Sequence, residues 1–168
     1  MTRWGVGPQW GRVTLMYAVL VVAAERIRPG MGDLPSSWHG IWLTGAGILL
    51  MLGAGVYMVT LQTLNLGLRN GALVTGGAFA VVRHPIYAAW ILLLLPGLAL
   101  LAESGLLLTV PIVAYLTFRA WIGREDRVLE SKFGDAYRAY RLRTPELFPR
   151  LLKKPIPGSL KQGGGETR

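Results

Sequence analysis

Apolar runs close to the length of a bilayer span constrain this chain more than any other feature. Residues Gly40 to Leu61 form the clearest run, and Pro85 to Ala102 and Gly105 to Ile122 form a closely spaced pair. A transmembrane helix needs about 20 predominantly apolar residues. The runs therefore predict an all-α integral membrane protein, because backbone polar groups in lipid must be satisfied within each segment.

A first candidate span is shorter than the others. Val13 to Ala24 contributes 12 residues, and spanning length is reached only if the chain from about Val6 is included. Val22-Ala23-Ala24 resembles a signal-peptide cleavage site, so a cleaved leader is an alternative to a first span. Trp4 and Trp10 favour the span, because tryptophan is enriched at membrane interfaces.

The charge distribution predicts the orientation. The net charge is +9, and twelve of the eighteen Lys and Arg residues lie from Arg119 onward, whereas the Glu103-Ser104 turn has neither. Because cytoplasmic loops are rich in Lys and Arg, we expect about four spans with both termini and the active site cytoplasmic, although Arg26 and Arg28 mildly oppose this.

A basic tail of this kind favours an anionic membrane surface. We expect no nucleic-acid partner, because no groove-reading motif accompanies the charge. Frequent Arg, Gly and Ala favour a bacterial inner membrane.

The segment after the last apolar run has an amphipathic pattern. Leu129, Phe133, Tyr137 and Tyr140 recur at spacings of 4, 4 and 3, with basic residues between them. This periodicity predicts one helix lying along the membrane interface, ended by Thr144-Pro145. We expect a single membrane-embedded domain over residues 1–154 and a disordered tail over 155–168.

Polar residues gather where the third run begins and where the fourth ends. Taking Ser104 as the tip of a helical hairpin, His84 lies 20 residues before it and Glu125 lies 21 after it. Each helical arm returns about 30 Å, so both residues should emerge at the same cytoplasmic depth. Charged residues near a span are functional candidates by default.

These polar residues also have structural interpretations. Arg83 can be a topology determinant, His84-Pro85 a helix cap followed by an N1 proline, and Tyr87 part of an aromatic belt. Arg124, Glu125 and Asp126 can be a solvated charge run at a helix exit. The chain has no cysteine and two histidines far apart, His39 and His84. This composition excludes disulfides and thiol catalysis, and we expect no metal site.

Three motifs together resemble one family. LVTGGAFAVVRHPIY covers Leu73 to Tyr87, EDRVLESKFGDAYRAY covers Glu125 to Tyr140, and Phe148-Pro149 follows. Their order and spacing, over about 80 residues from Asn70 to Pro149, are similar to those of the isoprenylcysteine carboxyl methyltransferase family. That family belongs with the membrane phospholipid methyltransferases.

The resemblance implies a methyltransferase that uses S-adenosylmethionine, with S-adenosylhomocysteine as product and the cofactor enclosed by residues 70–150. We expect Arg83, His84 and Glu125 to be catalytic. The cofactor contacts of the family fall on Leu73, Val74, Phe79, His84, Pro85, Ile86, Tyr87 and Glu125.

The chain departs from the family pattern at three positions. Phe79 stands where eukaryotic members have tyrosine, and Asp126 replaces the commoner second glutamate. The arginine on the substrate side falls on Trp121, with Arg119 and Arg124 nearby, so these three are the candidate substrate residues. Because of the third departure, the resemblance does not identify the methyl acceptor. The chain is also short at its N-terminus.

The chemistry of the cofactor suits these side chains. Glu125 can pair with a cationic or hydroxyl part, and the rings of Tyr87 and Phe79 can face the sulfonium or the adenine. Arg83 or His84 can bind the carboxylate. A carboxylate acceptor needs only an arginine to place it, whereas an amine or thiol acceptor would need His84 as a base.

We expect a lipophilic acceptor that enters from the bilayer, with the carboxylate of a prenylcysteine-like molecule as the leading candidate. Methylation of a phospholipid, an amine or another amphiphile is the alternative within the same class. A sterol-reductase-like enzyme using NADPH and a non-enzymatic membrane scaffold are alternatives from other classes. The sequence does not give the oligomeric state, because the glycines of the second span form no strict GxxxG motif.

Overall fold

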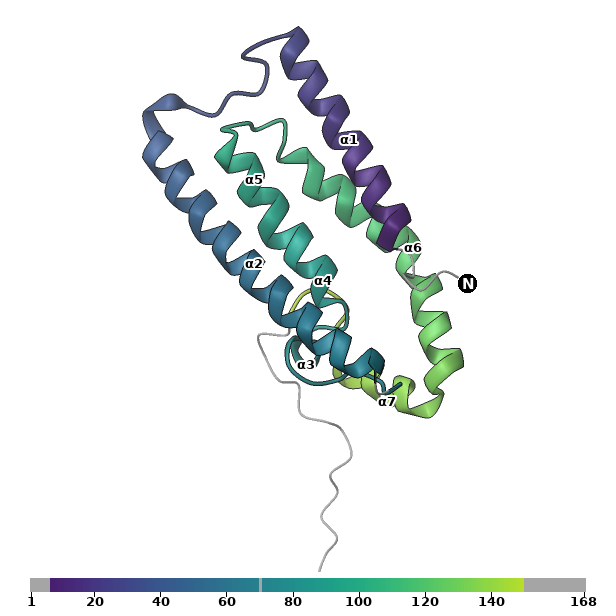
Figure 1. The fold of residues 1–168 in the computed structure, drawn as a ribbon. Coiled ribbons are helices and arrows are strands. Elements are labelled where there is room, and N and C mark those ends of the chain that lie inside the picture. The colour runs from purple at the N-terminus through teal and green to yellow at the C-terminus, as the bar shows by residue number, and fades with distance from the viewer. Residues whose placement is uncertain (1–6, 70, 150–168) are drawn as a thin grey trace, which may run out of the picture.

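The computed structural model describes residues 7–69 and 71–149 as a helical bundle (Figure 1). The expected tail over 155–168 lies outside these residues. Within them there is no β-strand, only an isolated bridge between Asp33 and Ser104. The helices are α1 (Gly7–Ile27), α2 (His39–Arg69), α3 (Ala78–Val81), α4 (Pro85–Ala88), α5 (Leu95–Leu101), α6 (Thr109–Phe133) and α7 (Asp135–Arg143), with a 3₁₀ turn η1 (Ser36–Trp38) and a π-helical turn η2 (Ala89–Leu94).

One described helix is long and apolar enough to cross a membrane. It covers Ser36–Gly67, which includes η1 and most of α2, and its apolar window has a mean hydropathy of 1.7. Pro85–Leu101, made of α4, η2 and α5, is apolar but shorter. The helical class expected from the sequence is confirmed, whereas the expected number of four spans is not.

The helices pair with partners that are distant in sequence. In Figure 1, α2 lies along the α4–η2–α5 arm, and α1 lies along α6. Glycine permits the closest of these contacts, since a Cβ on Gly53 of α2 would lie 2.7 Å from Leu94 Cδ2. The turn between α5 and α6 contacts the loop after α1, where Leu34 N donates to Glu103 O at 2.8 Å and Gly105 N donates to Gly32 O at 2.6 Å.

The fourth apolar run does not end where the sequence analysis placed its exit. We expected a span over Gly105 to Ile122 followed by a charge run, but α6 begins at Thr109 and continues to Phe133. Gly123 aside, most residues after Ile122, such as Arg124, Glu125 and Leu129, are good helix formers, so the helix continues through the charged segment. Glu125 and Asp126 therefore lie on a regular helix, which fixes the directions of their side chains.

The expected interfacial helix is wrong in two respects. It is interrupted at Gly134, whose φ of 53° is a conformation that glycine adopts readily. Leu129 and Phe133 belong to α6, whereas Tyr137 and Tyr140 belong to α7 and are buried at 1% and 8% exposure. The aromatic face of α7 thus packs into the protein, and α7 ends before Thr144 as expected.

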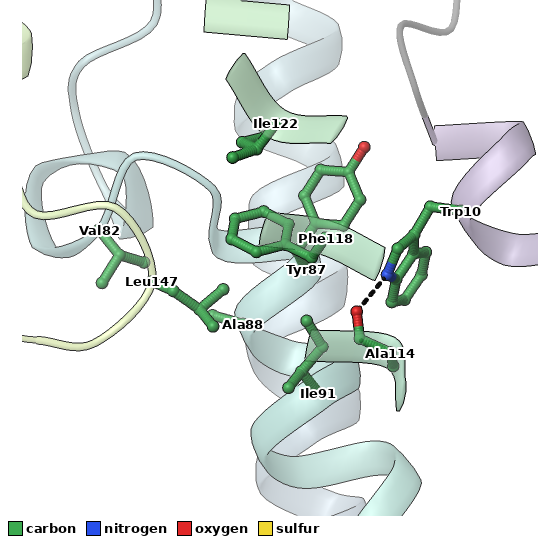
Figure 2. Packing of buried hydrophobic residues seen from close by; sticks show 9 residues of the cluster. All are labelled: Trp10, Val82, Tyr87, Ala88, Ile91, Ala114, Phe118, Ile122 and Leu147. Carbon is green, nitrogen blue, oxygen red and sulfur yellow. Dashed lines mark hydrogen bonds between the residues drawn. The ribbon is translucent and has the colours of Figure 1, made fainter. Parts of the chain in front are cut away.

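The buried core lies between the start of α1, the α4 arm, α6 and the segment after α7. Figure 2 shows Trp10 of α1 on one side of Tyr87 and Phe118, and Leu147 on the other side. The indole Nε1 of Trp10 donates to Ala114 O at 2.8 Å, which attaches α1 to α6. The full cluster consists of Trp10, Val82, Tyr87, Ala88, Ile91, Ala114, Phe118, Ile122 and Leu147.

Candidate functional site

The loop before α4 delivers Arg83 and His84 to the end of the bundle near α7. Pro85 occupies the first turn of α4, where its missing N–H costs nothing. His84 precedes that turn with φ −124° and ψ 63°. The backbone N–H groups of Arg83 and His84 donate to Pro145 O at 2.7 Å and Glu146 O at 3.2 Å. The segment after α7 thereby holds the main chain of both residues.

Asp126 connects three parts of the chain that are distant in sequence. Arg83 Nη1 donates to its Oδ2 at 2.9 Å, and His84 Nε2 lies 3.2 Å from its Oδ1. The Tyr137 hydroxyl of α7 donates to the same Oδ1 at 2.5 Å. Asp126 is 4% exposed. The loop, α6 and α7 therefore converge on one buried carboxylate.

The charges in this cluster stabilise one another. Burial alone would raise the pKa of Asp126, but the hydrogen bonds from His84, Tyr137 and Arg83 outweigh it and hold this pKa well below its usual range. Burial opposes ionisation of Arg83, yet the hydrogen bond and the charge of Asp126 raise its guanidinium pKa. Burial, followed by Asp126, raises the pKa of Tyr137. Asp126 is thus an ionised acceptor, and His84 Nε2 must carry a proton to donate to it.

Glu125 and Tyr87 form the neighbouring part of the site. The Tyr87 hydroxyl donates to Glu125 Oε2 at 3.1 Å, and His84 Nδ1 lies 3.9 Å from Glu125 Oε1. The expected meeting of His84 and Glu125 is therefore present. Glu125 keeps 24% of its side chain exposed, in contrast to the buried Asp126 beside it. Of the two neighbouring acids, Glu125 is the one that a ligand can reach.

Aromatic rings enclose this part of the site. Phe118 lies 5.7 Å from the His84 ring and 5.1 Å from the Tyr87 ring, centroid to centroid. Trp10 meets Tyr87 edge to face at 5.1 Å. The sequence analysis did not assign Trp10 or Phe118 to the site. Their burial lowers the local polarity, which strengthens the electrostatic interactions of Glu125.

Other expected cofactor residues lie in the segment that leads to α4. Leu73 and Val74 are half-buried between α2 and α3, and a Cβ on Gly67 would lie 2.0 Å from Val74 Cγ2, so this loop packs closely on the end of α2. Phe79, in α3, accepts a hydrogen bond on its carbonyl oxygen from the Tyr140 hydroxyl at 2.7 Å. Burial raises the pKa of Tyr140 to about 12, so this phenol stays protonated and donates.

Pro85 and Ile86 follow in the first turn of α4, where Pro85 is buried and Ile86 half-buried. The structure brings His84, Tyr87 and Glu125 together. Leu73, Val74, Phe79 and Ile86 lie on adjoining segments.

The expected substrate residues do not form one cluster. Arg119 is exposed on α6 and forms an ion pair with Glu146. Trp121 is half-buried and packs against the core cluster, whereas Arg124 is exposed. Arg119 also lines an open pocket of about 380 Å³ together with Tyr115, Pro145, Glu146, Leu147 and Phe148. Pro145 and Glu146 therefore contact the main chain of Arg83 and His84 and also line this pocket.

The segment after α7 packs into the core through Leu147 and not through the neighbouring Phe148. Leu147 is 2% exposed within the core cluster, whereas Phe148 is 55% exposed. The Phe148 ring does contact the Tyr115 ring at 5.8 Å. Leu147 is the residue that anchors the segment after α7.

Two residues of the cluster, Asp126 and Tyr137, were not expected at the site from the sequence. Only Asp126 had a signal in the sequence that could have identified it. Asp126 continues a buried row of α6 at spacings of four residues, which places it on the apolar face and not in a solvated charge run. Tyr137 was placed toward lipid, and no sequence signal opposed that placement. The buried row consists of Val110, Ala114, Phe118, Ile122 and Asp126.

Two observations bear on ligands. Residues 7–69 and 71–149 contain no group of three or more His, Asp or Glu side chains placed to hold a metal ion. In the same part of the chain, Arg83 Nε is a buried donor without a hydrogen-bond acceptor. A buried donor without an acceptor is costly, and an anionic group would satisfy it.

Comparisons with known proteins agree with the motifs. A family model for the isoprenylcysteine carboxyl methyltransferase (ICMT) family matches residues 46–131, which includes the Arg83-His84 and Glu125-Asp126 positions. The match ends before α7. No solved structure gives a significant match to the chain.

Curated relatives include two bacterial proteins and one yeast enzyme. The chain is 38% identical over 123 residues to the cobalt-zinc-cadmium resistance protein CzcN of Cupriavidus metallidurans, covering 69% of this chain and 55% of that protein. It is 34% identical over 123 residues to the nickel-cobalt-cadmium resistance protein NccN of Alcaligenes xylosoxydans xylosoxydans, covering 69% of this chain and 56% of that protein.

The protein-S-isoprenylcysteine O-methyltransferase of Schizosaccharomyces pombe is 36% identical over 81 residues, which cover 48% of this chain and 34% of the enzyme. The chain spans about half the length of the two bacterial relatives. The family match covers half of the chain and contains both polar motifs that meet at Asp126 and Glu125. The chain belongs to the isoprenylcysteine carboxyl methyltransferase family.

Proposed function

We propose that this chain is an integral membrane methyltransferase that uses S-adenosylmethionine to methylate a lipophilic acceptor. One observation carries the proposal. Side chains from two segments 38 residues apart, Tyr87 and Glu125, meet through a hydrogen bond, with His84 beside them. Within a methyltransferase family, a partly exposed carboxylate bordered by aromatic rings suits a positively charged cofactor.

The residues of the site fit the chemical groups of the cofactor. Glu125 would hold a hydroxyl or cationic group, and Tyr87 would orient that carboxylate through its hydroxyl. Arg83 would donate from its unsatisfied Nε toward the carboxylate of the cofactor. When bound, S-adenosylmethionine supplies an electrophilic methyl group. His84, Tyr87 and Glu125 contribute by fixing the orientation of bound groups, which is a large part of the catalysis of an in-line displacement.

The pocket beside Arg119 is the proposed site for the acceptor head group. It combines one guanidinium with the aromatic side chains of Tyr115 and Phe148. An anionic head group would compete with Glu146 for Arg119, while an apolar tail would remain against the exposed hydrophobic surface of the bundle. This arrangement supports a prenylcysteine-like carboxylate as the leading acceptor. The other candidate substrate residues, Trp121 and Arg124, lie on adjoining parts of α6.

A phospholipid or amine acceptor is the second candidate. His84 supports it, because an imidazole beside Glu125 is placed to accept a proton from a neutral or cationic nucleophile. Two of the relatives are bacterial proteins named for metal resistance. The bacterial origin of these two relatives supports an acceptor that is present in bacteria.

We also propose that the chain lies in the bacterial inner membrane with both termini and the site facing the cytoplasm. The helix Ser36–Gly67 supports membrane insertion, and Met51 and Ile41 on it are 80% and 61% exposed, as lipid-facing residues would be. Exposed cations on the last turns of α6 and on α7, among them Arg127, Lys132 and Arg143, support contact with anionic lipid.

One experiment tests the activity and separates the acceptors. The purified protein is incubated with methyl-labelled S-adenosylmethionine and either a bacterial lipid extract or a synthetic prenylcysteine, and the labelled product is identified by mass spectrometry. We expect label in an extracted lipophilic product, and the acceptor that carries it distinguishes the two candidates. Glu125→Gln serves as the matched inactive control. Absence of transfer to either acceptor, together with oxidation of NADPH in the presence of sterol-like substrates, would contradict the proposal.

A further inference from the structure

The second acid of the Glu125-Asp126 pair has a separate role in the structure. Asp126 ends the row of buried α6 residues, and a carboxylate in such a position is costly unless its oxygens are satisfied. Its two oxygens accept from Arg83, His84 and Tyr137. Its side chain is 6% exposed, against 24% for Glu125. Both oxygens of Asp126 are thus engaged by side chains of the protein itself.

The two side chains that Asp126 holds are also held through their backbones. Arg83 N and His84 N donate to the carbonyl groups of Pro145 and Glu146. The segment after α7 thus restrains the main chain of both residues, and α6 restrains their side chains. Such restraint defines the position of a site residue before any ligand arrives.

The geometry points to Asp126 as a positioning residue that acts through His84: its carboxylate keeps a proton on His84 Nε2 and directs the opposite ring nitrogen, Nδ1, toward Glu125. Tyr137 and Arg83 hold the carboxylate in place. Nδ1 is then the nitrogen that faces Glu125 Oε1, at 3.9 Å, where a bound ligand would meet it. The link from this orientation to methyl transfer rests on the function proposed above, whereas the orientation itself does not.

The rings around His84 leave few other orientations. Tyr87 and Phe118 both pack against the imidazole at an angle of 70° between ring planes. A 180° ring flip would put Cε1 in the place of Nε2 and Cδ2 in the place of Nδ1, so the hydrogen bond to Asp126 would be lost. The carboxylate therefore selects one of two ring orientations that the apolar packing alone does not distinguish, because the flipped ring has nearly the same shape.

The chain is well suited to a direct test, because it has only two histidines. His39 lies far from the site, exposed and paired with Glu103. In a His39→Gln background, ¹⁵N-histidine labelling gives the ring nitrogens of His84 alone. The spectrum of the detergent-solubilised protein without ligand reports which nitrogen carries the proton.

At neutral pH we expect a proton on Nε2 of His84 in the protein with Asp126 intact. In Asp126→Asn, the two ring nitrogens should share the proton, because an amide can either donate or accept. The dissociation constant of S-adenosylhomocysteine should rise by about 10- to 100-fold in the same variant. Asp126→Glu should retain the Nε2 proton and most of the affinity. Asp135→Asn, an exposed acid on α7 that pairs with Arg138, should change neither measurement.

Two results would overturn the inference: a proton confined to Nδ1 with Asp126 intact, or an unchanged His84 spectrum in Asp126→Asn. If Asp126→Asn does not fold, the spectrum of the protein with Asp126 intact decides by the first criterion alone. A failure of S-adenosylhomocysteine to bind, with the Nε2 proton in place, would contradict the proposed function and leave the positioning of His84 standing.

Discussion

Arg83 and Asp126 are 43 residues apart in the chain, yet the guanidinium Nη1 lies 2.9 Å from the carboxylate Oδ2 in a buried site. Each is the charge that makes burial of the other tolerable. Removal of one partner from a buried pair leaves the other without compensation, which costs far more than the pair contributes as a whole. The contact joins the loop before α4 to α6, so the proposed cofactor site and the fold depend on the same interaction.

The first prediction concerns the pH dependence of stability. The pKa of Asp126 is lower in the folded protein than in the unfolded chain, so the unfolded state binds the proton more readily. The stabilisation from Asp126 is present above its ordinary pKa and is lost as the pH falls through and below about 4. Thermal unfolding in detergent between neutral and acidic pH should show this loss in the wild-type protein. Asp126→Asn should be less stable than the wild-type protein at neutral pH, and its stability should fall less on acidification. If the stability of the two proteins falls in parallel with pH, the stabilising role of the Asp126 charge is contradicted.

The second prediction concerns the ligand-facing residues. His84→Ala and Glu125→Ala should each weaken binding of S-adenosylhomocysteine by about 1–3 kcal/mol, because each leaves a polar partner unsatisfied. Equilibrium dialysis with labelled ligand measures the change. Asp135→Ala, an exposed acid on α7, is the control and should bind like the wild-type protein. Unchanged affinity in both site variants would mean that these residues are purely structural.

The third prediction concerns Trp10, which lies outside the part of the chain that the family model matches. Trp10→Phe removes the hydrogen bond to Ala114 O and reduces the contact with Tyr87. We expect a loss of about 1–3 kcal/mol in the free energy of unfolding, together with weaker ligand binding. Trp38→Phe is the control, since Trp38 is 55% exposed and contacts only Trp42 among aromatic rings of the described residues. Equal unfolding free energies for the two variants would contradict the placement of α1 against the site.

The fourth prediction uses two glycines with open surroundings. A Cβ on Gly134 or on Gly123 would meet no other atom within 4 Å, so packing does not distinguish them. Gly134 has a φ of 53° between α6 and α7, and Gly134→Ala should destabilise the protein by about 1–2 kcal/mol. Gly123 lies inside α6, and Gly123→Ala should stabilise it by about 0.5–1 kcal/mol. Chemical unfolding measures both, and changes of the same sign would show that α6 and α7 are not separated at Gly134.

The helical class and the meeting of His84 with Glu125 could be predicted from the sequence. The apolar run Gly40 to Leu61 is long enough to identify α2 by itself, because few other structures accommodate such a run. The count of residues on each side of Ser104 gave the relative depth of the two polar residues. A helical hairpin with a short turn has little freedom to change that depth.

The roles of the two neighbouring acids could not be predicted in the same way. Glu125 and Asp126 are equally polar, and the point where α6 turns its face to the core depends on packing with α1 and the α4 arm. The same limit applies to Tyr137 and Tyr140. Their helical spacing indicates a shared face, but not whether that face meets lipid or protein. The continuation of α6 to Phe133 was missed because charged residues were interpreted as a helix exit.

Calorimetric titration of S-adenosylhomocysteine into the purified protein, with NADPH as the comparison ligand, tests the central claim most directly. We predict saturable binding of S-adenosylhomocysteine at one site per chain, weakened in Glu125→Gln, and no heat of binding with NADPH. Saturable binding of NADPH with no response to S-adenosylhomocysteine would contradict the claim that the residues around His84 and Glu125 form a methyl-donor site.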